Sequence, residues 1–178
     1  RFPMESGSFY CFMKSIFLVL LNFSALLSFA QNEKTNRDSF YLNIVVDSDN
    51  NYGMDIQTSP YFVKDYILQI YPTEKLFIET ELKNDTIFSM KVVKENIYPE
   101  KTIVVEFKQS AEDRNKVSML LNVKNPFDKN LIYKALMFTP FSNELKATSI
   151  IPVKPKLSAF EIWPHAIISL VLTDWKLE

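Results

Sequence analysis

Cysteine and glycine are nearly missing from this chain of 178 residues, which has one cysteine and two glycines. The cysteine, Cys11, precedes a long apolar run, so the chain from residue 31 onward holds no thiol and no disulfide. Gly53 is the only glycine of that part. Phosphate-cradling loops need several glycines, so P-loop and dinucleotide-binding enzymes are excluded. We expect the stability of the fold to come from packing alone.

Histidine is equally scarce, because His165 is the only one in the chain. A single histidine excludes zinc sites that need two imidazole ligands. A Ser-His-Asp triad would have to use His165, yet no G-x-S-x-G elbow is present. We therefore predict no catalytic residue, no cofactor and no enzymatic activity, and interpret His165 as a polar ring at a strand entrance.

A surplus of basic charge is also lacking. The chain has 20 Lys and Arg against 21 Asp and Glu, a formal net charge of −1. Nucleic-acid binders normally carry a basic face that releases counterions from phosphates. The lysines of this chain alternate with acids throughout, so we predict no binding to nucleic acid.

An apolar run over residues 16–29 follows Lys14 and ends before the polar segment that begins at Gln31. A membrane-spanning helix needs about 20 apolar residues, so this run has the length of a signal-peptide core. Ser28 and Ala30 supply the small side chains that a leader peptidase accepts. The sequence predicts a signal helix over 1–30 that is cleaved before Gln31. Met13 is a candidate for the true start, which would place residues 1–12 upstream of it.

Two alternatives for the apolar run stay open, an uncleaved N-terminal anchor and a buried helix. Cleavage predicts an exported protein, which is periplasmic, at the cell surface or secreted and meets the membrane only transiently through its signal peptide. The polar residues 31–38 predict a flexible lead-in. Residues 39–178, in a chain that is 47% hydrophobic and 14% aromatic, predict a single domain with a full core.

From Phe40 onward, apolar residues alternate with polar ones and turn residues interrupt the pattern every eight to twelve residues or so, which is typical of β-strands. In the hairpin over 75–92, Asn84 and Asp85 form the expected turn. We predict that Leu76, Ile78, Thr80 and Leu82 face the core, together with Phe88, Met90 and Val92. Further buried faces are predicted for Ile103, Val105 and Phe107, for Val117, Met119, Leu121 and Val123, and for Leu131, Tyr133, Ala135 and Met137.

Residues 167–172 are apolar on both faces and predict a central strand covered on both sides. Residues 60–71 fit either a helix capped by Ser59 or a strand over 66–71, and we favour the strand. The sequence thus predicts an all-β fold, an antiparallel two-sheet sandwich. Since glycine is so rare, we expect Gly53 at a sharp bend and asparagines at the other left-handed positions. The candidates are Asn50, Asn51, Asn84, Asn115, Asn130 and Asn143.

The stretch "VSMLLNVKNPFDKNLIYKALMF" within residues 102–178 resembles the hairpins of immunoglobulin-like and fibronectin type III-like domains of exported bacterial proteins. The resemblance is one of pattern, because the cystine pair of antibody domains is absent. It implies an Ig-like sandwich that serves as a binding or spacer module. Fold likeness does not fix function.

The loop "DSDNNYGMD" offers oxygen ligands at alternate positions, from Asp47, Asp49, Asn51 and Asp55. Such a set is a candidate calcium site. The EF-hand spacing fails, since glycine is the seventh residue instead of the sixth and Thr58 stands where a bidentate Glu is needed. A solvated loop stabilised by Asx turns is the alternative.

Aromatic side chains are the remaining functional signal. Tyr61, Tyr66, Trp163 and Trp175 are candidates for a ligand-binding platform, because Tyr and Trp combine a flat apolar face with a polar group. Glu79 and Glu81 lie two residues apart on one strand face, about 6.6 Å by strand rise, as in inverting glycosidases. Core packing and an outer strand face explain these residues as well.

Our leading interpretation is an exported, non-catalytic β-sandwich protein that acts in binding or as a structural part of the cell envelope, with an unknown protein or glycan partner. One alternative is a carbohydrate-binding module. Another is an enzyme that cleaves glycans or peptides with carboxylates alone. Exposed aromatics in a line would favour the first alternative, and two carboxylates facing each other in a pocket would favour the second.

Overall fold

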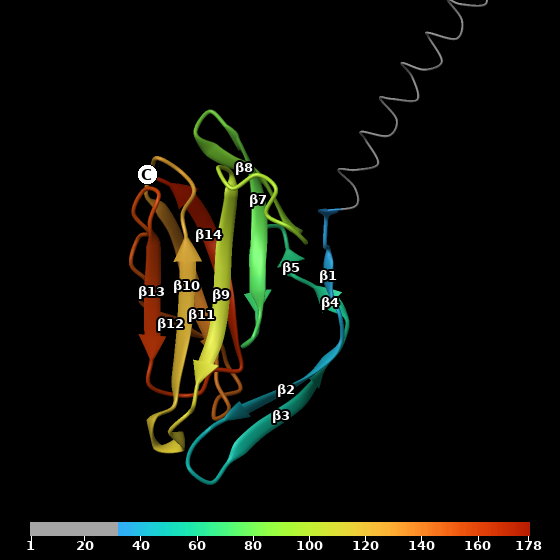
Figure 1. Ribbon diagram of the computed structural model, residues 1–178, viewed down its shortest axis with the longest axis vertical. Helices are drawn as coiled ribbons and strands as arrows, with labels where there is room; N and C mark the ends of the chain where they lie inside the picture. Colours follow the sequence, from blue (N-terminus) through green and yellow to red (C-terminus); the bar gives the residue numbers. More distant parts are fainter. Residues whose placement is uncertain (1–31) are drawn as a thin grey trace, which may run out of the picture. The chain divides into compact units, whose positions relative to one another are not determined.

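Two five-stranded antiparallel sheets face each other across the main core of the protein (Figure 1). The computed structural model describes residues 32–178, and the signal helix predicted over 1–30 lies outside them. The strands in chain order are β1 (Asn36–Arg37), β2 (Phe40–Val45), β3 (Asn51–Ile56), β4 (Ser59–Pro60), β5 (Phe62–Lys64), β6 (Ile67–Ile70), β7 (Lys75–Lys83), β8 (Thr86–Val93), β9 (Thr102–Ser110), β10 (Ser118–Lys124), β11 (Leu131–Phe138), β12 (Lys146–Thr148), β13 (Ser158–Trp163) and β14 (Ser169–Leu177). A short 3₁₀ helix, η1 (Arg114–Lys116), joins β9 to β10.

The first sheet has the strand order β13-β10-β9-β7-β8 and the second has the order β12-β11-β14-β6-β5. Two small two-stranded sheets, β1-β4 and β2-β3, complete the described part of the chain. The prediction of an all-β, two-sheet antiparallel sandwich is confirmed. Residues 67–70 form strand β6, in which Leu68 and Ile70 are fully buried, so the strand interpretation of this segment holds and the helix does not.

In the first sheet, buried and more exposed side chains alternate along the strands, and the buried ones form its side of the core. Ile103, Val105 and Phe107 of β9 are fully buried, and the residues between and after them are more exposed, whereas Thr102 at the strand start is buried. β10 buries Met119, Leu121 and Val123 in the same way. These predicted faces are confirmed, because a period of two in the sequence matches the pleat of a strand with one buried face.

The hairpin β7–β8 is confirmed, including its turn. Asn84 and Asp85 have φ values of 50° and 59°, which is the type I′ geometry that suits the twist of a hairpin. Near the turn the predicted faces are wrong. Glu81 lies opposite Ser89 and Leu82 lies opposite Ile87, so Phe88 is the extra residue of a β-bulge.

The bulge reverses the two faces of β8 beyond it. Phe88 is 59% exposed, whereas its neighbour Ile87 is buried, and Leu82 of β7 is 42% exposed. Met90 and Val92, on the other side of the bulge, are buried as predicted. One inserted residue therefore moves Phe88 out of the core, whereas Leu82 lies opposite the buried Ile87 and is exposed next to the β7–β8 turn.

Strand β14 lies in the middle of the second sheet, between β11 and β6. Leu170 and Leu172 are fully buried in the main core, which confirms the predicted central strand. Ile168, just before β14, belongs to a second cluster with Leu42 and Ile44 of β2. The hairpin β2–β3 thus covers the other side of the chain at the entrance to β14.

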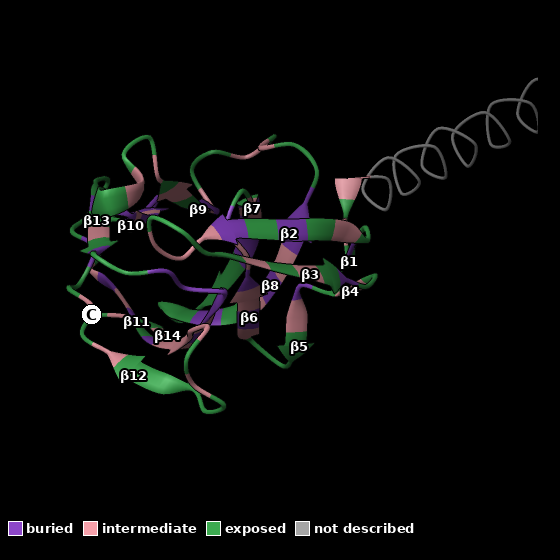
Figure 2. Cartoon of the chain, turned by 90° about the horizontal axis from the view of Figure 1, so that it is seen from below, coloured by how far each residue is buried: buried purple, intermediate pink, exposed green. Residues whose placement is uncertain are grey.

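The hairpin β2–β3 alternates buried and exposed residues (Figure 2). It is tied to β9 by one side chain. Gln109 accepts a hydrogen bond from Val45 N through Oε1 and donates one to Val45 O through Nε2, both at 2.8 Å. The amide group thereby acts like a residue of a neighbouring strand and satisfies both backbone groups of Val45.

Gly53 does not form a bend, which corrects the prediction for this residue. It lies within β3 opposite Asn43, and an added Cβ would come 2.1 Å from Tyr41 Oη. The side chain of Tyr41 thus takes the space above the glycine. The hairpin turns instead at 46–50, where Val46 N donates to Asn50 O.

The prediction that asparagines fill the left-handed positions is also wrong for all but Asn84. Within residues 32–178, the positive-φ residues other than glycine are Asp65, Thr73, Asn84, Asp85, Lys156 and Asp174. Aspartate tolerates this region for the same reason as asparagine, its short polar side chain. Thr73 and Lys156 each follow a proline in a tight turn, at the position where a type II turn demands a positive φ.

Candidate functional site

A cleft of about 630 Å³ lies at the end of the sandwich where the β7–β8 turn is found, the upper end in Figure 1. We call it the hairpin-end cleft. It is formed by the β7–β8 turn, the residues before β9, the β10–β11 connection and the end of β14, so both sheets contribute to it. Its lining consists of Thr80, Glu81, Leu82, Asp85, Glu100, Lys101, Pro126, Phe127, Asp128, Lys129, Lys156 and Leu177.

Asn125 holds the wall of this cleft in place. Its side chain is fully buried and donates through Nδ2 to the carbonyls of Lys129, Val153 and Lys154, at 2.7, 2.9 and 3.2 Å. Its Oδ1 accepts from Phe127 N at 2.9 Å. One amide thus joins the β10–β11 connection to the segment before β13. A loop fixed in this way loses little further entropy when a ligand binds.

Lys156 occupies a strained position on the same wall. Its φ is 59°, and its Nζ binds Pro126 O at 2.7 Å and Asp128 Oδ1 at 3.2 Å. A lysine with positive φ carries a conformational cost that glycine would avoid. The contacts of its ammonium group with the β10–β11 connection offset part of that cost.

The charges of the cleft are unevenly balanced. Each of the three lysines has a carboxylate partner: Lys101 pairs with Glu79 at 3.1 Å, Lys129 with Asp85 at 3.0 Å, and Lys156 with Asp128. Glu81 and Glu100 have no ion pair among residues 32–178. The uncompensated charge of the lining is therefore negative, and it lies beside the apolar side chains of Leu82, Phe127 and Leu177.

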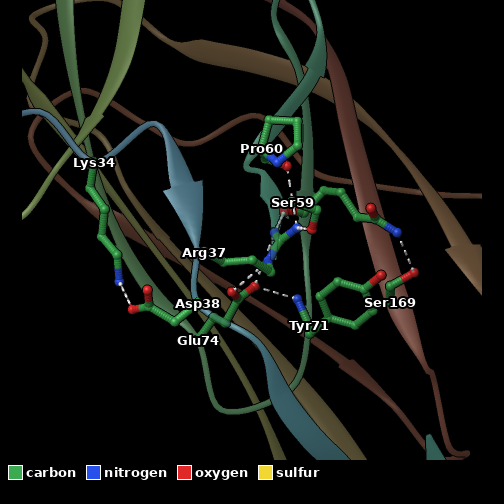
Figure 3. Close-up of polar contacts among 9 residues, drawn as sticks. Lys34, Arg37, Asp38, Ser59, Pro60, Tyr71, Glu74 and Ser169 are labelled. Atoms are coloured by element: carbon green, nitrogen blue, oxygen red, sulfur yellow. Dashed lines mark hydrogen bonds and ion pairs between the residues drawn. The ribbon is translucent and has the colours of Figure 1, made fainter. Parts of the chain in front are cut away.

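A second cluster, around Arg37, is closed to ligands (Figure 3). Arg37 is 1% exposed, and its guanidinium directs all five N–H groups to acceptors. Nε and Nη2 bind the carboxylate of Glu74, Nη1 binds Ser59 Oγ and Pro60 O, and Nη2 also binds Gln69 O at 2.6 Å. No donor remains for a ligand, so the cluster has a structural role.

The faces of the same guanidinium are also covered. The rings of Tyr61 and Tyr71 lie 4.8 and 4.9 Å from Arg37 Cζ. The polar composition of 31–38 predicts a flexible lead-in, but Asn36 and Arg37 instead form strand β1, which pairs with β4. The reason is the burial of Arg37, since its fully satisfied guanidinium anchors the strand.

The four aromatic candidates do not form one exposed platform. Tyr61 and Trp163 are 4% and 8% exposed, and Trp163 Nε1 donates to Thr148 Oγ1 at 2.9 Å. Trp175 stacks on Tyr133 with ring centroids 4.9 Å apart and donates to Tyr66 O. Tyr66 is 39% exposed, and its hydroxyl donates to Phe88 O. Most of this aromatic surface is therefore used in packing and internal hydrogen bonds.

Three of the four candidate calcium ligands, Asp47, Asp49 and Asn51, make side-chain hydrogen bonds within the protein. Asp47 Oδ1 accepts from the backbone amides of Asp49 and Asn50 in an Asx turn, and the Asn50 side-chain amide also donates to this carboxylate. These bonds, with that from the Asn50 side chain the strongest, hold the pKa of Asp47 below its usual range. Asn51 Oδ1 accepts from Arg114 Nη2, and Asp55 lies in strand β3 opposite Tyr41. Residues 32–178 contain no group of three His, Cys, Asp or Glu side chains placed to hold a metal ion.

Glu79, Glu81 and His165, the candidates for acid–base chemistry, lie in three separate places. Glu79 is buried and bound to Lys91 and Lys101, whereas Glu81 lines the hairpin-end cleft. His165 is at the opposite end of the sandwich, exposed, with Nε2 3.4 Å from Met137 Sδ. Of the residues considered from sequence for chemistry, only Glu81 belongs to the hairpin-end cleft. Asn125, Phe127 and Lys156 carried no sequence signal, because a connection between strands gives no periodic pattern.

No family model matches this chain, and no curated protein or solved structure shows significant similarity to it. In the described part of the chain, no helix has the length and apolar character needed to cross a bilayer.

Proposed function

We propose that this chain is an exported, non-catalytic binding module with an Ig-like sandwich, and that the hairpin-end cleft binds a basic, partly apolar segment of a partner protein. One observation carries the proposal. The same cleft contains apolar side chains, those of Leu82, Phe127 and Leu177, and two carboxylates that lack an ion-pair partner within residues 32–178, those of Glu81 and Glu100. A lysine or arginine beside an apolar side chain complements both features.

Strand order supports the Ig-like part of the proposal. β9, β10 and β13 are neighbours in one sheet, and β12, β11 and β14 are neighbours in the other, as A, B, E and C′, C, F are in immunoglobulin-like domains. The place beside F that strand G takes in those domains is filled here by β6, antiparallel to β14. The apolar run and small residues before Gln31 support export.

The geometry of the cleft supports a peptide over a sugar. A sugar-binding surface uses exposed aromatic faces, whereas Phe127, the aromatic residue of this lining, is itself buried. The walls are loops that converge on the end of a rigid sandwich, which is where binding residues commonly lie. Binding would therefore combine contact with the apolar side chains of the cleft and ion pairs with Glu81 and Glu100.

A titration of the ¹⁵N-labelled full chain with three short peptides tests the proposal. One peptide alternates lysine and leucine, one alternates glutamate and leucine, and one alternates serine and glycine. We expect saturable shifts at the amides of Thr80 to Lys83 and Phe127 to Lys129 with the lysine peptide alone. Glu81→Gln and Glu100→Gln should each weaken binding about three- to tenfold, the effect of losing one partly exposed charge pair.

Glu144→Gln is the matched control, because Glu144 is exposed in the β11–β12 connection at the other end of the sandwich. It should leave the affinity unchanged. Equal shifts with all three peptides, or a loss of affinity equal in the three variants, would contradict the proposal. Shifts at the same amides with a neutral oligosaccharide, and none with the lysine peptide, would favour a carbohydrate-binding module.

A further inference from the structure

A second cleft, of about 570 Å³, lies at the opposite end of the sandwich. β9 begins next to the hairpin-end cleft and ends next to this one, so the two are separated by the length of the strand. We call it the Arg114 cleft. Three connections meet there: the β2–β3 turn, the β9–β10 connection with η1, and the residues between β13 and β14. Its lining consists of Val46, Asp47, Ser48, Arg114, Asn115, Lys116, Val117, Ser118, Pro164 and His165.

Arg114 is held in a fixed position by neutral acceptors. Nε donates to Ser48 O at 2.8 Å, and Nη2 donates to Asn51 Oδ1 at 2.8 Å and to Asn50 O at 3.4 Å. Two of the acceptors belong to the β2–β3 turn and the third to the first residue of β3, and none carries a charge. For Nη1, no partner is found among residues 32–178. The guanidinium is thus ordered, yet its charge is not cancelled by a bound carboxylate.

The comparison with Arg37 shows how unusual this arrangement is within the protein. These two are the only arginines after residue 30. Arg37 is buried, uses all of its donors and is neutralised by Glu74. Arg114 is partly exposed, keeps the donors of Nη1 and faces a cleft. The guanidinium of Arg114 is fixed by the bonds of Nε and Nη2, and its Nη1 donors remain available. Such an arginine is preorganised to bind an anion.

The other charges of the lining agree with an anionic ligand. Asp47 is its only acid. Hydrogen bonds, first that from the Asn50 side chain, lower the pKa of this carboxylate, and the Arg114 charge contributes as well. Asp47 and Arg114 form no ion pair, because both oxygens of Asp47 accept hydrogen bonds from its own turn. Lys116 is 82% exposed at its side chain and lies 3.6 Å from Asp113 Oδ2, a loose surface pair. The lining therefore carries an excess of positive charge.

We propose that the Arg114 cleft is a binding site for an oxyanion group, a carboxylate or a phosphate, which Nη1 of Arg114 contacts directly while Lys116 supplies a second positive charge. The ordered guanidinium makes the site preorganised, since no long side chain has to be fixed when the anion arrives. The site involves no residue of the hairpin-end cleft, so the test of this proposal is independent of the test of the function proposed above.

The ¹⁵N-labelled full chain, titrated separately with inorganic phosphate and with acetate at constant ionic strength set by sodium chloride, tests the site. A third titration uses sodium chloride alone. With phosphate or acetate, and not with chloride, we expect a saturable shift of the Arg114 Nε–Hε signal and of the amides of Asn115 to Ser118. A response to phosphate alone would identify a phosphate site, and a response to both a general oxyanion site. Arg114→Gln should weaken the binding about tenfold or more, the usual effect of losing a charge-assisted hydrogen bond.

Lys116→Ala keeps the test decisive if loss of Arg114 loosens the β2–β3 turn. It should weaken binding about two- to fourfold, the effect of losing an exposed charge, and leave the Asp47 turn signals unchanged. Lys146→Ala, an exposed lysine of β12, is the matched control and should bind as the unaltered chain does. Equal shifts with chloride, or equal binding by the Arg114 variant and the unaltered chain, would overturn the proposal.

Discussion

Arg37 and Glu74, 37 residues apart in sequence, form an ion pair in which Arg37 Nε lies 2.9 Å from Glu74 Oε1 and the arginine side chain is 2% exposed. Glu74 Oε2 also accepts from Tyr71 N at 2.8 Å. The pair thus joins strand β1 to the turn that leads from β6 into β7. Removing one partner of such a pair leaves the other charge without compensation, so the pair holds the segment in place.

Removing the guanidinium should therefore be costly. We expect Arg37→Met to lower the free energy of unfolding by about 3–5 kcal/mol, because Glu74 is left buried without its partner. Arg37→Lys should recover only part of this, since an ammonium cannot reach both the carboxylate and three further acceptors. Urea unfolding measures both, and Lys146→Ala is an exposed control. An Arg37→Met protein as stable as the original would show that the cluster is not an anchor.

Tyr133→Phe should stabilise the protein. The hydroxyl of Tyr133 is buried in the core and has no hydrogen-bond partner within residues 32–178. An unsatisfied buried polar group costs about 1–3 kcal/mol, so its removal should raise the free energy of unfolding by about 1 kcal/mol or more. Thermal unfolding checks this, with Tyr66→Phe, which loses a made hydrogen bond, as the contrasting variant. A lower melting temperature for Tyr133→Phe would refute it.

Stability should also fall in alkali through the same residue. Burial raises the pKa of Tyr133, and burial likewise raises the pKa of Tyr71. The unfolded chain releases these protons near pH 10 while the folded chain retains them, so the free energy of unfolding decreases as the pH rises above about 10. Below that pH neither tyrosine contributes a slope. In Tyr133→Phe the alkaline loss should be visibly smaller, as urea midpoints at pH 9 and 11 would show.

Thr73→Gly should stabilise the turn beside the Arg37 cluster. Thr73 has a φ of 81°, a region that a β-branched residue rarely adopts. Its backbone N–H donates to Phe107 O at 2.8 Å, and glycine would keep this bond. We expect a gain of about 1 kcal/mol in urea unfolding from the relieved strain. Thr86→Gly, at a strand position with ordinary backbone angles, should instead lose stability.

Strand β13 should limit the solubility of the protein. It lies at the edge of the first sheet and exposes Phe160 and Ile162, at 58% and 66%. An unpaired strand edge with apolar side chains is a site where chains associate. We expect Ile162→Lys to slow aggregation, measured by light scattering at rising concentration. Leu157→Lys, which adds the same charge outside the strand, should have less effect, and equal effects would point to charge alone.

The sandwich could be predicted from the sequence because one buried face per strand leaves an alternating pattern, as in β9 and β10. The bulge at Phe88 could not, because no glycine or proline marks it. Arg37 sits in a polar stretch and gives no local sign of burial, which depends on Glu74 and two tyrosines far along the chain. Trp163 lies near a strand end, where exposure is common, yet Thr148 satisfies its indole and allows it to be buried.

The two clefts are also hard to predict from the sequence, because their walls depend on contacts between distant segments of the chain. Each is formed by connections that the topology brings together, and their residues have no fixed spacing. Glu81 was identified through its strand, whereas Asn125 and Arg114 act through backbone carbonyls whose positions are known only from the fold. The acidic loop is visible in the sequence, but the hydrogen bonds of Asp47 to its own turn and of Asn51 to Arg114 depend on the fold.

The position of β14 constrains the order in which the protein can fold. Its neighbour β6 is made much earlier, and Gln69 meets Ser169 across 100 residues of chain. The second sheet therefore stays split in two until β14 has been synthesised, and closing so long a loop is slow. For the export proposed above, this delay would be useful, because a polypeptide that cannot complete its core early would stay unfolded enough to pass through a secretion channel.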